Sequence, residues 1–496
     1  MKSLTCFCHK NILFSKGRFN IMIKKRTTEE KKNGRIYTPN FVVCNILDMV
    51  GYNNKNIIKK NIIDNSCGDG SFLKEIVKRY CEIALKNNFS IKEIKQDLEN
   101  HIFGIELDEL ECNKCKKNLS NVAALYDIKN VHWNIICGNA LKINNYNKKM
   151  DFVVGNPPYV RVHNLENLDE IKTFDFAKEG MTDLYIVFFE VGIKMLNEKG
   201  ILGYITPSSY FTSKSSRAMR NYIVKYNLLT DIVDFKHTQL FNATTYSCIT
   251  ILNMKNMKDD VKYFEYDSKK QKPFLVEELS SKDYIIDHCF YFSKKESLCK
   301  LKAILSFTPL FNKNYIAVKN GFATLLDKFF IQDNLPFTDY IIPILKSSTG
   351  KWKQCFFPYK NGTLISLKTL QENENIKNYY ATNIDLLKKR TNENPLVWWG
   401  FGRSQGLKDV DKTKYSLNSL VKTLGDVKLI ECPPGTGVYS GLYIVTDFNF
   451  DKVRNVLVSE NFIQYVALLG KYKSGGYYTF SSTDVKKFLD YYLLKG

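Results

Sequence analysis

"IIDNSCGDGSFL", residues 62–73, is the stretch that decides the fold. It begins as a short buried strand, and apolar residues at helical spacing follow from Phe72. Asp64 ends the strand, and Gly68 and Gly70 lie in the turn before the helix. Glycine allows a backbone to approach a ligand closely. In a doubly wound sheet such a turn lies at the carboxyl edge of the strands, where these folds bind nucleotides.

This turn lacks the third glycine of the dinucleotide fingerprint, and no Lys-Ser or Lys-Thr pair follows it. Both a dinucleotide and a loop that grips phosphates are therefore disfavoured. We expect a ligand of nucleoside size.

Strand and helix patterns alternate up to about Asn253 and predict an α/β domain with a parallel, doubly wound sheet. The polar, lysine-rich stretch 253–273 is the expected boundary, and mixed α and β segments rich in aromatic residues follow it. We expect an N-terminal extension at 1–30, a first domain at 31–260 and a second at 275–496. The predicted strands lie at 61–66, 101–108, 131–140, 151–156, 200–207, 229–235 and 246–254.

The composition limits the class of protein. The chain has 496 residues, which suggests two or three domains, and its net charge of +21 favours nucleic acid as a partner, although evenly spread lysine would weaken that inference. Thirteen scattered cysteines and no evident signal peptide indicate a reducing cytoplasm, and no apolar run is long enough to span a membrane. Residues 1–28 carry no acid, which resembles a transit peptide; we expect an extended start, with Met22 as an alternative initiator.

The only CxxC motif is Cys112 with Cys115, and no second pair follows at the spacing of a zinc site. We therefore expect two thiols on a helix and no metal.

Two further strand ends carry polar side chains. Glu106 at the end of the second strand can accept both hydroxyls of a ribose, but an acid beside Asp108 and Glu109 can equally be a solvated surface group. Asn139, after the third strand, can offer its amide to a purine, although an ordinary turn former is the better reading of this residue alone.

The fourth strand ends in "VVGNPPYVR", residues 153–161, where two prolines form a rigid corner without amide donors. The corner presents two acceptors, the side-chain oxygen of Asn156 and a main-chain carbonyl. Tyr159 adds an aromatic face. Two acceptors beside a stacking face fit the exocyclic amine of a nucleobase.

Taken together and in this order, these motifs resemble the S-adenosylmethionine-dependent DNA adenine-N6 methyltransferases of the gamma class, TaqI-like and Eco57I-like. "GRIYTPNFVV" (34–43), "DLYIVFFEVG" (183–192) and "DFKHTQLFNATTYSCITIL" (234–252) resemble further motifs of that family. Asn139 departs from the pattern, because many members carry Asp there. The cofactor-binding residues that the resemblance implies are Thr38, Pro39, Asp64, Cys67, Gly68, Gly70, Glu106, Asn139 and Phe188.

The resemblance also implies a mechanism in which the target adenine is flipped out of double-stranded DNA. The base would stack on Tyr159 with Phe241 as the second wall, and its N6 amine would donate to Asn156 and to the Pro157 carbonyl. Neither a metal nor a covalent nucleophile is required. The implied catalytic residues are Asn156, Pro157, Pro158, Tyr159 and Phe241.

Other reactions fit less well. Cytosine-C5 methylation needs a nucleophilic cysteine in a Pro-Cys pair, and only the reversed Cys432-Pro433 occurs. Cytosine-N4 methylation stays open, although that group usually has Ser in place of Asn156. An rRNA or protein methyltransferase and a catalytically silent DNA-binding subunit are the alternatives from other classes. A fused nuclease is disfavoured, because only about 30 residues precede the first motif.

The second half resembles the target-recognition domain of TaqI-like methylases. Arg403, Lys471 and Lys473 stand among aromatic residues and are candidates for DNA contacts. Trp398 and Trp399 are expected to be packing residues. The expected partners are double-stranded DNA and a separate cognate endonuclease. We expect a monomeric enzyme that does not associate with a membrane.

Overall fold

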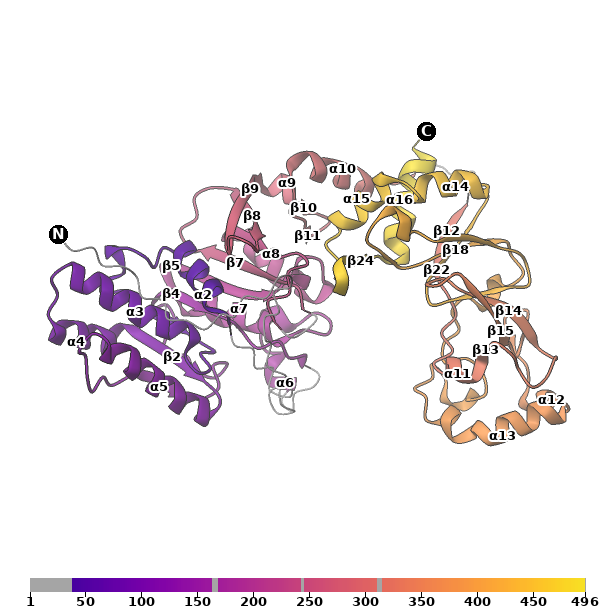
Figure 1. Ribbon diagram of the computed structural model, residues 1–496, viewed down its shortest axis with the longest axis horizontal. Coiled ribbons are helices and arrows are strands. Elements are labelled where there is room, and N and C mark those ends of the chain that lie inside the picture. Colours follow the sequence, from indigo (N-terminus) through magenta and orange to yellow (C-terminus); the bar gives the residue numbers. More distant parts are fainter. Residues whose placement is uncertain (1–37, 163–167, 242–244, 310–314, 496) are drawn as a thin grey trace, which may run out of the picture.

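The computed structural model describes residues 38–162, 168–241, 245–309 and 315–495, and every structural statement below refers to these residues. Figure 1 shows an arch: a large sheet with its helices stands at one end, a smaller lobe around α13 stands at the other, and α10, α15 and α16 lie between them. The predicted N-terminal extension at 1–30 lies outside the described residues.

A nine-stranded sheet with the order β3-β2-β1-β4-β5-β7-β6-β8-β9 forms the first part. The five strands β3, β2, β1, β4 and β5 run parallel, so their carboxyl ends meet at one edge. The sheet strands are β1 (Ile62–Asp64), β2 (Ile102–Glu106), β3 (Asn134–Cys137), β4 (Met150–Gly155), β5 (Leu196–Pro207), β6 (Leu229–Asp234), β7 (Ser247–Asn253), β8 (Asp260–Asp267) and β9 (Lys272–Ser280).

The prediction of a parallel sheet is wrong for β7, which pairs antiparallel with both β5 and β6. The described residues between β6 and β7 form no helix. A parallel return usually runs through a helical crossover, so a connection without a helix fits an antiparallel pair.

Helices cover both faces of this sheet. Adjacent strand residues enter different cores: Ile62 and Val154 belong to one, Ile63 and Val153 to the other. Strands buried on both faces read as continuous apolar runs, which is why the sequence predicts them. One face carries α2 (Asn40–Met49), α3 (Ser71–Lys86), α4 (Ile91–His101) and α5 (Glu109–Ala124), and the other α6 (Leu168–Ile171), α7 (Leu184–Met195) and α8 (Arg217–Lys225).

The large sheet continues through the polar stretch 253–273, where the sequence indicates a domain boundary. Strand β8 pairs with β6, and β9 pairs with β8 as the edge strand that ends at Ser280. An edge strand carries charged residues because one side of it faces water. That polar character explains why the stretch reads as a linker.

The second part is a mixed α+β assembly, as predicted. Its sheets have the orders β12-β22-β18-β20, β13-β15-β14-β21 and β19-β24-β23, with the short pairs β10-β11 and β16-β17. The strands are β10 (Ile285–Ile286), β11 (Cys289–Phe290), β12 (Ile316–Asn320), β13 (Ile331–Gln332), β14 (Ile341–Lys346), β15 (Lys351–Phe356), β16 (Tyr359–Lys360), β17 (Thr363–Leu364), β18 (Lys414–Leu417), β19 (Leu420–Val421), β20 (Leu429–Cys432), β21 (Gly437–Tyr439), β22 (Leu442–Thr446), β23 (Tyr472–Lys473) and β24 (Tyr477–Thr479). The helices are α9 (Ser281–Tyr284), α10 (Lys295–Ser306), α11 (Asp327–Phe330), α12 (Leu367–Leu370), α13 (Glu374–Lys388), α14 (Phe450–Leu457), α15 (Glu460–Leu468) and α16 (Ser482–Leu494).

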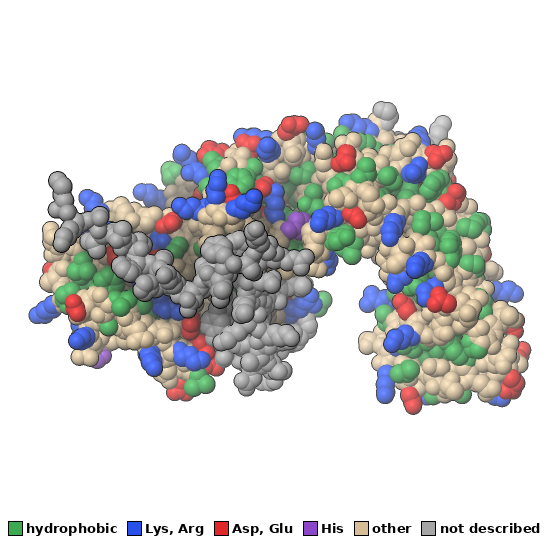
Figure 2. All heavy atoms as spheres, in the orientation of Figure 1, with side chains coloured by type: hydrophobic (Ala, Val, Ile, Leu, Met, Phe, Trp, Pro, Cys, Tyr) green, Lys and Arg blue, Asp and Glu red, His purple; other side chains and the backbone are tan. Residues whose placement is uncertain are grey.

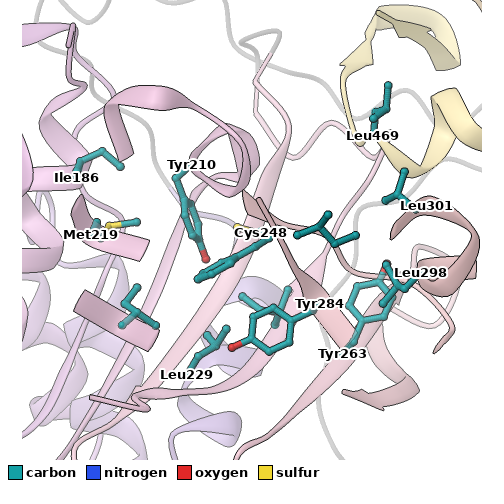
Figure 3. Packing of buried hydrophobic residues seen from close by; sticks show 14 of the residues in the cluster. Ile186, Tyr210, Met219, Leu229, Cys248, Tyr263, Tyr284, Leu298, Leu301 and Leu469 are labelled. Atoms are coloured by element: carbon teal, nitrogen blue, oxygen red, sulfur yellow. The ribbon is translucent and has the colours of Figure 1, made fainter. Parts of the chain in front are cut away.

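One hydrophobic core joins the large sheet to the helices of the arch. Figure 3 shows Leu298 of α10 beside Tyr263, and Leu301 and Leu469 farther along the same core, where Leu469 follows α15. The lobe around α11 to α13 has a core of its own. The arch helices are therefore an extension of the first part, and the lobe is a separately packed unit.

Candidate functional site

The carboxyl ends of β1, β2 and β4 bring Asp64, Glu106 and Asn156 to one edge of the sheet, because these three strands are neighbours. Asn139 follows β3 at the same edge. The structure thus brings these predicted positions together at one edge of the sheet. Their individual roles depend on the geometry below.

Glu106 is held by two backbone amides. Its Oε2 accepts a hydrogen bond from the Gly68 N–H at 2.9 Å, and its Oε1 accepts one from the Asp108 N–H at 3.0 Å. A carboxylate offers about four lone-pair sites, so acceptor capacity remains on both oxygens. An oriented, half-buried carboxylate of this kind suits two neighbouring hydroxyls.

The two glycines of the turn serve different ends. Gly68 has a φ of +54°, and a Cβ placed on it would meet nothing within 4 Å. Gly70 has a φ of +89°, and its Cβ would lie 2.9 Å from the Cys115 Sγ on α5. Open space for a ligand therefore lies over Gly68, whereas Gly70 allows α3 to pack closely on α5.

Asp64 lies inside the loop and is 1% exposed. Its Oδ1 accepts a hydrogen bond from the Ser66 N–H at 3.0 Å. Burial raises the pKa of Asp64 from 3.8 to about 8, although the Ser66 amide opposes the rise and the charge of Glu106 adds to it. A Cβ on Gly155 would lie 2.7 Å from this Oδ1, so glycine there makes room for the carboxyl group. The buried Asp64 carboxyl group therefore stabilises the conformation of the loop.

The thiol of Cys67 also faces the interior. A hydrogen bond with the Cys115 thiol and burial together raise the pKa of Cys67 well above its usual value. The Cys67 N–H donates to the Ile105 carbonyl at 3.0 Å, which ties the glycine turn to β2. Cys67 can therefore face a cofactor with its backbone only.

The Asn156 corner is bound to both neighbouring motifs. The Asn156 Nδ2 donates to the Thr38 Oγ1 at 3.1 Å, and the Asn156 carbonyl accepts from the Ser66 Oγ at 3.4 Å. Pro39 is the residue that precedes helix α2. These contacts place the first motif, the glycine turn and the proline corner around one space.

Tyr159 is oriented by its hydroxyl, which donates to the Ile205 carbonyl at 3.2 Å. Its ring meets those of Tyr185 and Phe241 edge to face, with centroids 6.1 and 6.3 Å away and planes at 74° in both pairs. A base stacked between two rings needs parallel faces. In this conformation Phe241 therefore packs on the edge of Tyr159, and its predicted role as the opposite wall requires the ring to reorient.

Asn139 and Phe188 occupy different settings. The Asn139 Oδ1 accepts from the Leu141 N–H at 3.0 Å, so the amide hydrogens of Asn139 remain as the groups that can donate to a purine. Phe188 on α7 is 6% exposed and belongs to the core under the site. The hydrogen-bond polarity at Asn139 is thus that of a donor.

Sequence reasoning misses Ser66 and Tyr185 as parts of this site. Ser66 lies inside the quoted glycine motif, and its hydroxyl contact with the Asn156 carbonyl has no sequence signal. The Tyr185 hydroxyl lies 3.2 Å from the Ser209 Oγ, and its ring supports Tyr159. An aromatic residue next to Phe188 in the 183–192 motif is the one hint.

The candidate DNA contacts of the second part separate into two kinds. Arg403 and Lys473 are exposed and form no ion pair with any described residue. The Lys471 Nζ is bound to the Asp484 carboxylate at 2.5 Å. Lys471 thus has a structural partner, and its predicted contact with DNA would compete with it. Trp398 and Trp399 pack on the core of the lobe, which confirms the prediction that they are packing residues.

Within the described residues, no helix is long and apolar enough to cross a membrane. The same part of the chain contains no group of three His, Cys, Asp or Glu side chains arranged to hold a metal ion. Cys112 and Cys115 lie buried on α5, as the sequence predicts.

The first part of the chain is similar to proteins of a known family. Residues 14–241 match the model of the Eco57I restriction-modification methylase family. The Type II methyltransferase M.BstVI of Geobacillus stearothermophilus is 27% identical over 421 residues, which cover 74% of each chain. The Type II restriction enzyme and methyltransferase RM.Eco57I of Escherichia coli is 32% identical over 147 residues, which cover 28% of this chain and only 14% of that enzyme.

Solved structures support the same fold. The restriction-modification enzyme MmeI, solved in complex with DNA, superposes with a TM-score of 0.61 at 14% identity and covers 90% of this chain and 64% of its own. The DrdV–DNA complex gives a TM-score of 0.53 at 12% identity, over 93% of this chain and 57% of that one. The chain thus spans less than two thirds of either enzyme.

The site fits the cofactor of this family: Glu106 offers an oriented carboxylate for a pair of hydroxyls, the space over Gly68 is open, and Asn139 has an amide to donate. Residues 14–241 are therefore similar to the Eco57I restriction-modification methylases, and S-adenosylmethionine is the cofactor that this site fits.

Proposed function

We propose that the protein methylates N6 of an adenine that is flipped out of double-stranded DNA, as the modification enzyme of a restriction-modification system. The single observation that carries the proposal is the position of the Asn156 corner. Thr38 and Ser66 hold it directly beside the glycine turn, so acceptors for an amine lie next to the space for the cofactor.

S-adenosylmethionine supplies a methyl group on a sulfonium centre, with a neutral leaving group. The work of the chain is to orient the acceptor amine and to exclude water. In the proposal the Asn156 Oδ1 and the Pro157 carbonyl accept the two N6 hydrogens. The nitrogen lone pair is then directed at the methyl group.

Tyr159 provides the stacking face. Its hydroxyl is fixed on the Ile205 carbonyl, so the ring is held before a base arrives. Phe241 would turn from its edge contact to cover the other face of the base. Burial raises the pKa of Tyr159 well above its usual value, so its hydroxyl stays neutral.

Two further parts belong to the proposal. The curated relative M.BstVI bears the name of a Type II methyltransferase, and we propose the same division of labour here, with a separate endonuclease that cleaves the unmodified sequence. We also propose that the enzyme acts as a cytoplasmic monomer.

The test is methyl transfer from tritiated S-adenosylmethionine to unmethylated genomic DNA, with nucleosides identified by mass spectrometry. Wild type is compared with Asn156→Ala and with Asn121→Ala, an exposed position on α5. We expect N6-methyladenine from wild type and from Asn121→Ala. Asn156→Ala should lose at least about 100-fold in rate, because the groups that orient the amine are removed.

Three outcomes would contradict the proposal. N4-methylcytosine as the product would show that the target base is cytosine and not adenine. Transfer to RNA or protein but not to DNA would replace the substrate class. Unchanged transfer in Asn156→Ala would remove the role of the proline corner.

A further inference from the structure

A cavity of about 880 Å³ lies between the first part of the chain and the end of the second. Tyr159 and Arg161 line it on one side, and Lys473 lines it on the other. Its volume is in the range of small-molecule sites and suits a nucleotide. Tyr159, the stacking residue of the proposed site, therefore also lines this cavity.

The outer wall of this cavity includes the β23–β24 hairpin, which is fixed to the large sheet. The Tyr472 hydroxyl donates to the Asp234 Oδ2 at 2.8 Å, across 238 positions of sequence. The His237 ring lies edge to face with Tyr472 and Tyr478, at centroid distances of 4.8 and 4.7 Å. Aromatic pairs of this geometry add to the stability of a contact beyond the area they bury. The hairpin is therefore held in place as one wall of the cavity by these contacts with the large sheet.

The cavity is lined by more cations than acids, and only some of the cations have a partner. Three lysines are engaged in ion pairs: Lys236 with Glu265, Lys300 with Glu296 and Lys471 with Asp484. Arg161 and Lys473, in contrast, are exposed and form no ion pair with any described residue. Each part of the chain thus presents one available cation to the cavity.

Figure 2 shows the setting of this wall: the molecule is deeply hollowed between the large-sheet end and the lobe, and lysine and arginine side chains border the hollow. A duplex in the hollow would reach the cavity from its open side. An adenine extruded toward Tyr159 carries a phosphate on each side, and these two charges must pass the mouth of the cavity.

We infer that the β23–β24 hairpin is the outer wall of the pocket for the extruded nucleotide, and that Arg161 and Lys473 bind the phosphates that flank it. The inference rests on the proposed function and names the part of the substrate that each region holds. It makes the end of the chain a component of the catalytic pocket in addition to any role in sequence recognition.

The first experiment uses fluorescence anisotropy to measure how DNA affinity depends on salt concentration. The variants are Arg161→Gln and Lys473→Gln, and Lys86→Gln at the exposed end of α3 is the matched control. Each phosphate contact contributes a slope of about 0.9 in log K against log salt. For Arg161→Gln and Lys473→Gln we expect this slope to be shallower than that of wild type by about one. The control should have the slope of wild type.

The second measurement tests where the contacts fall. After sequencing has located the methylated site, a duplex carries 2-aminopurine at the target and uncharged methylphosphonate linkages on both sides of it. Wild type should bind this duplex more weakly than the charged one. Arg161→Gln and Lys473→Gln should each lose less from the neutral linkages, and should show a smaller rise in 2-aminopurine fluorescence at saturation.

The inference is overturned if both variants keep the wild-type salt slope, or if they lose as much affinity as wild type from the neutral linkages. Wild type that binds the duplex without a rise in fluorescence overturns it as well. Failure of the proposed function is distinguishable, because it appears as absent methyl transfer by wild type. The salt slopes on genomic DNA still decide the phosphate contacts in that case.

Discussion

The cofactor edge of the large sheet and the lobe around α13 are assembled in different ways. At the edge, each polar side chain lies at the carboxyl end of one strand or in the turn that follows it. In the lobe, β14 pairs with β21, which places Ile344 beside Gly437, and the adjoining sheet places Ile316 beside Thr446. The comparison teaches that the site is a sum of local units, whereas the second part depends on pairings between distant segments.

The two regions also differ in their hydrophobic cores. Leu301 and Leu469 share a core with the large sheet, whereas Phe356 and Tyr380 belong to the core of the lobe alone. A change in one core should therefore leave the function of the other region in place. Of the four changes that follow, the first two test that separation, and the last two concern the large sheet and the hairpin fixed to it.

Phe356→Ala should have the largest effect and should be confined to the lobe. The side chain is fully buried, and its removal leaves a cavity that costs about 3–5 kcal/mol of unfolding free energy. Thermal unfolding should acquire an early transition, and DNA affinity should fall. S-adenosylmethionine binding, measured by calorimetry, should equal that of wild type. A parallel loss of cofactor binding would show that the two regions unfold as one.

Glu106→Ala should do the reverse. It removes the carboxylate that accepts from Gly68 and Asp108 and that is proposed to hold the ribose, so we expect S-adenosylmethionine affinity to fall about 10- to 100-fold. DNA affinity without cofactor should be unchanged. Glu372→Ala, at an exposed position of the lobe, is the control and should bind cofactor normally. Full affinity in Glu106→Ala would remove the ribose assignment.

Asp64→Asn should change how stability depends on pH. Burial holds the pKa of Asp64 at about 8, whereas in the unfolded chain it lies near 3.8. Between these values the folded chain keeps a proton that the unfolded chain has lost, so stability falls as pH rises, by at most about 1.4 kcal/mol per pH unit. The variant lacks this loss.

Without cofactor, the melting temperature of Asp64→Asn relative to that of wild type should therefore rise between pH 6 and pH 8. Asp385→Asn, on the exposed side of α13, should show no such gain. A constant difference between Asp64→Asn and wild type across this range would mean that the buried carboxyl group does not titrate there.

Tyr472→Phe should have the smallest effect. It deletes the hydrogen bond to Asp234 but keeps the ring against His237, so we expect a loss of about 1 kcal/mol in unfolding free energy. Burial already raises the pKa of Asp234, and losing the hydroxyl should raise it further. Stability at neutral pH is measured by urea unfolding, with Tyr477→Phe on the exposed face of the hairpin as the control. Equal losses in both variants would argue against a specific link.

Sequence reasoning anticipates much of the site and little of its surroundings. The positions of Asp64, Glu106 and Asn156 follow from strand ends, because the carboxyl ends of parallel strands share an edge. The edge contact of Phe241 with Tyr159 and the ion pair of Lys471 with Asp484 do not follow, since each depends on how side chains from separate elements meet.

The sequence by itself determined the α/β class, the glycine turn, the proline corner and the order of the motifs. These features are local: each needs only the apolar pattern of a few residues and the backbone preferences of Gly and Pro. Only the tertiary structure decided that the sheet runs on to Ser280, that β7 is antiparallel, and that the β23–β24 hairpin lines a cavity together with Tyr159. Contacts between segments hundreds of residues apart, such as Asp234 with Tyr472, leave no periodic trace in a single sequence, because either residue alone satisfies the local pattern in which it stands.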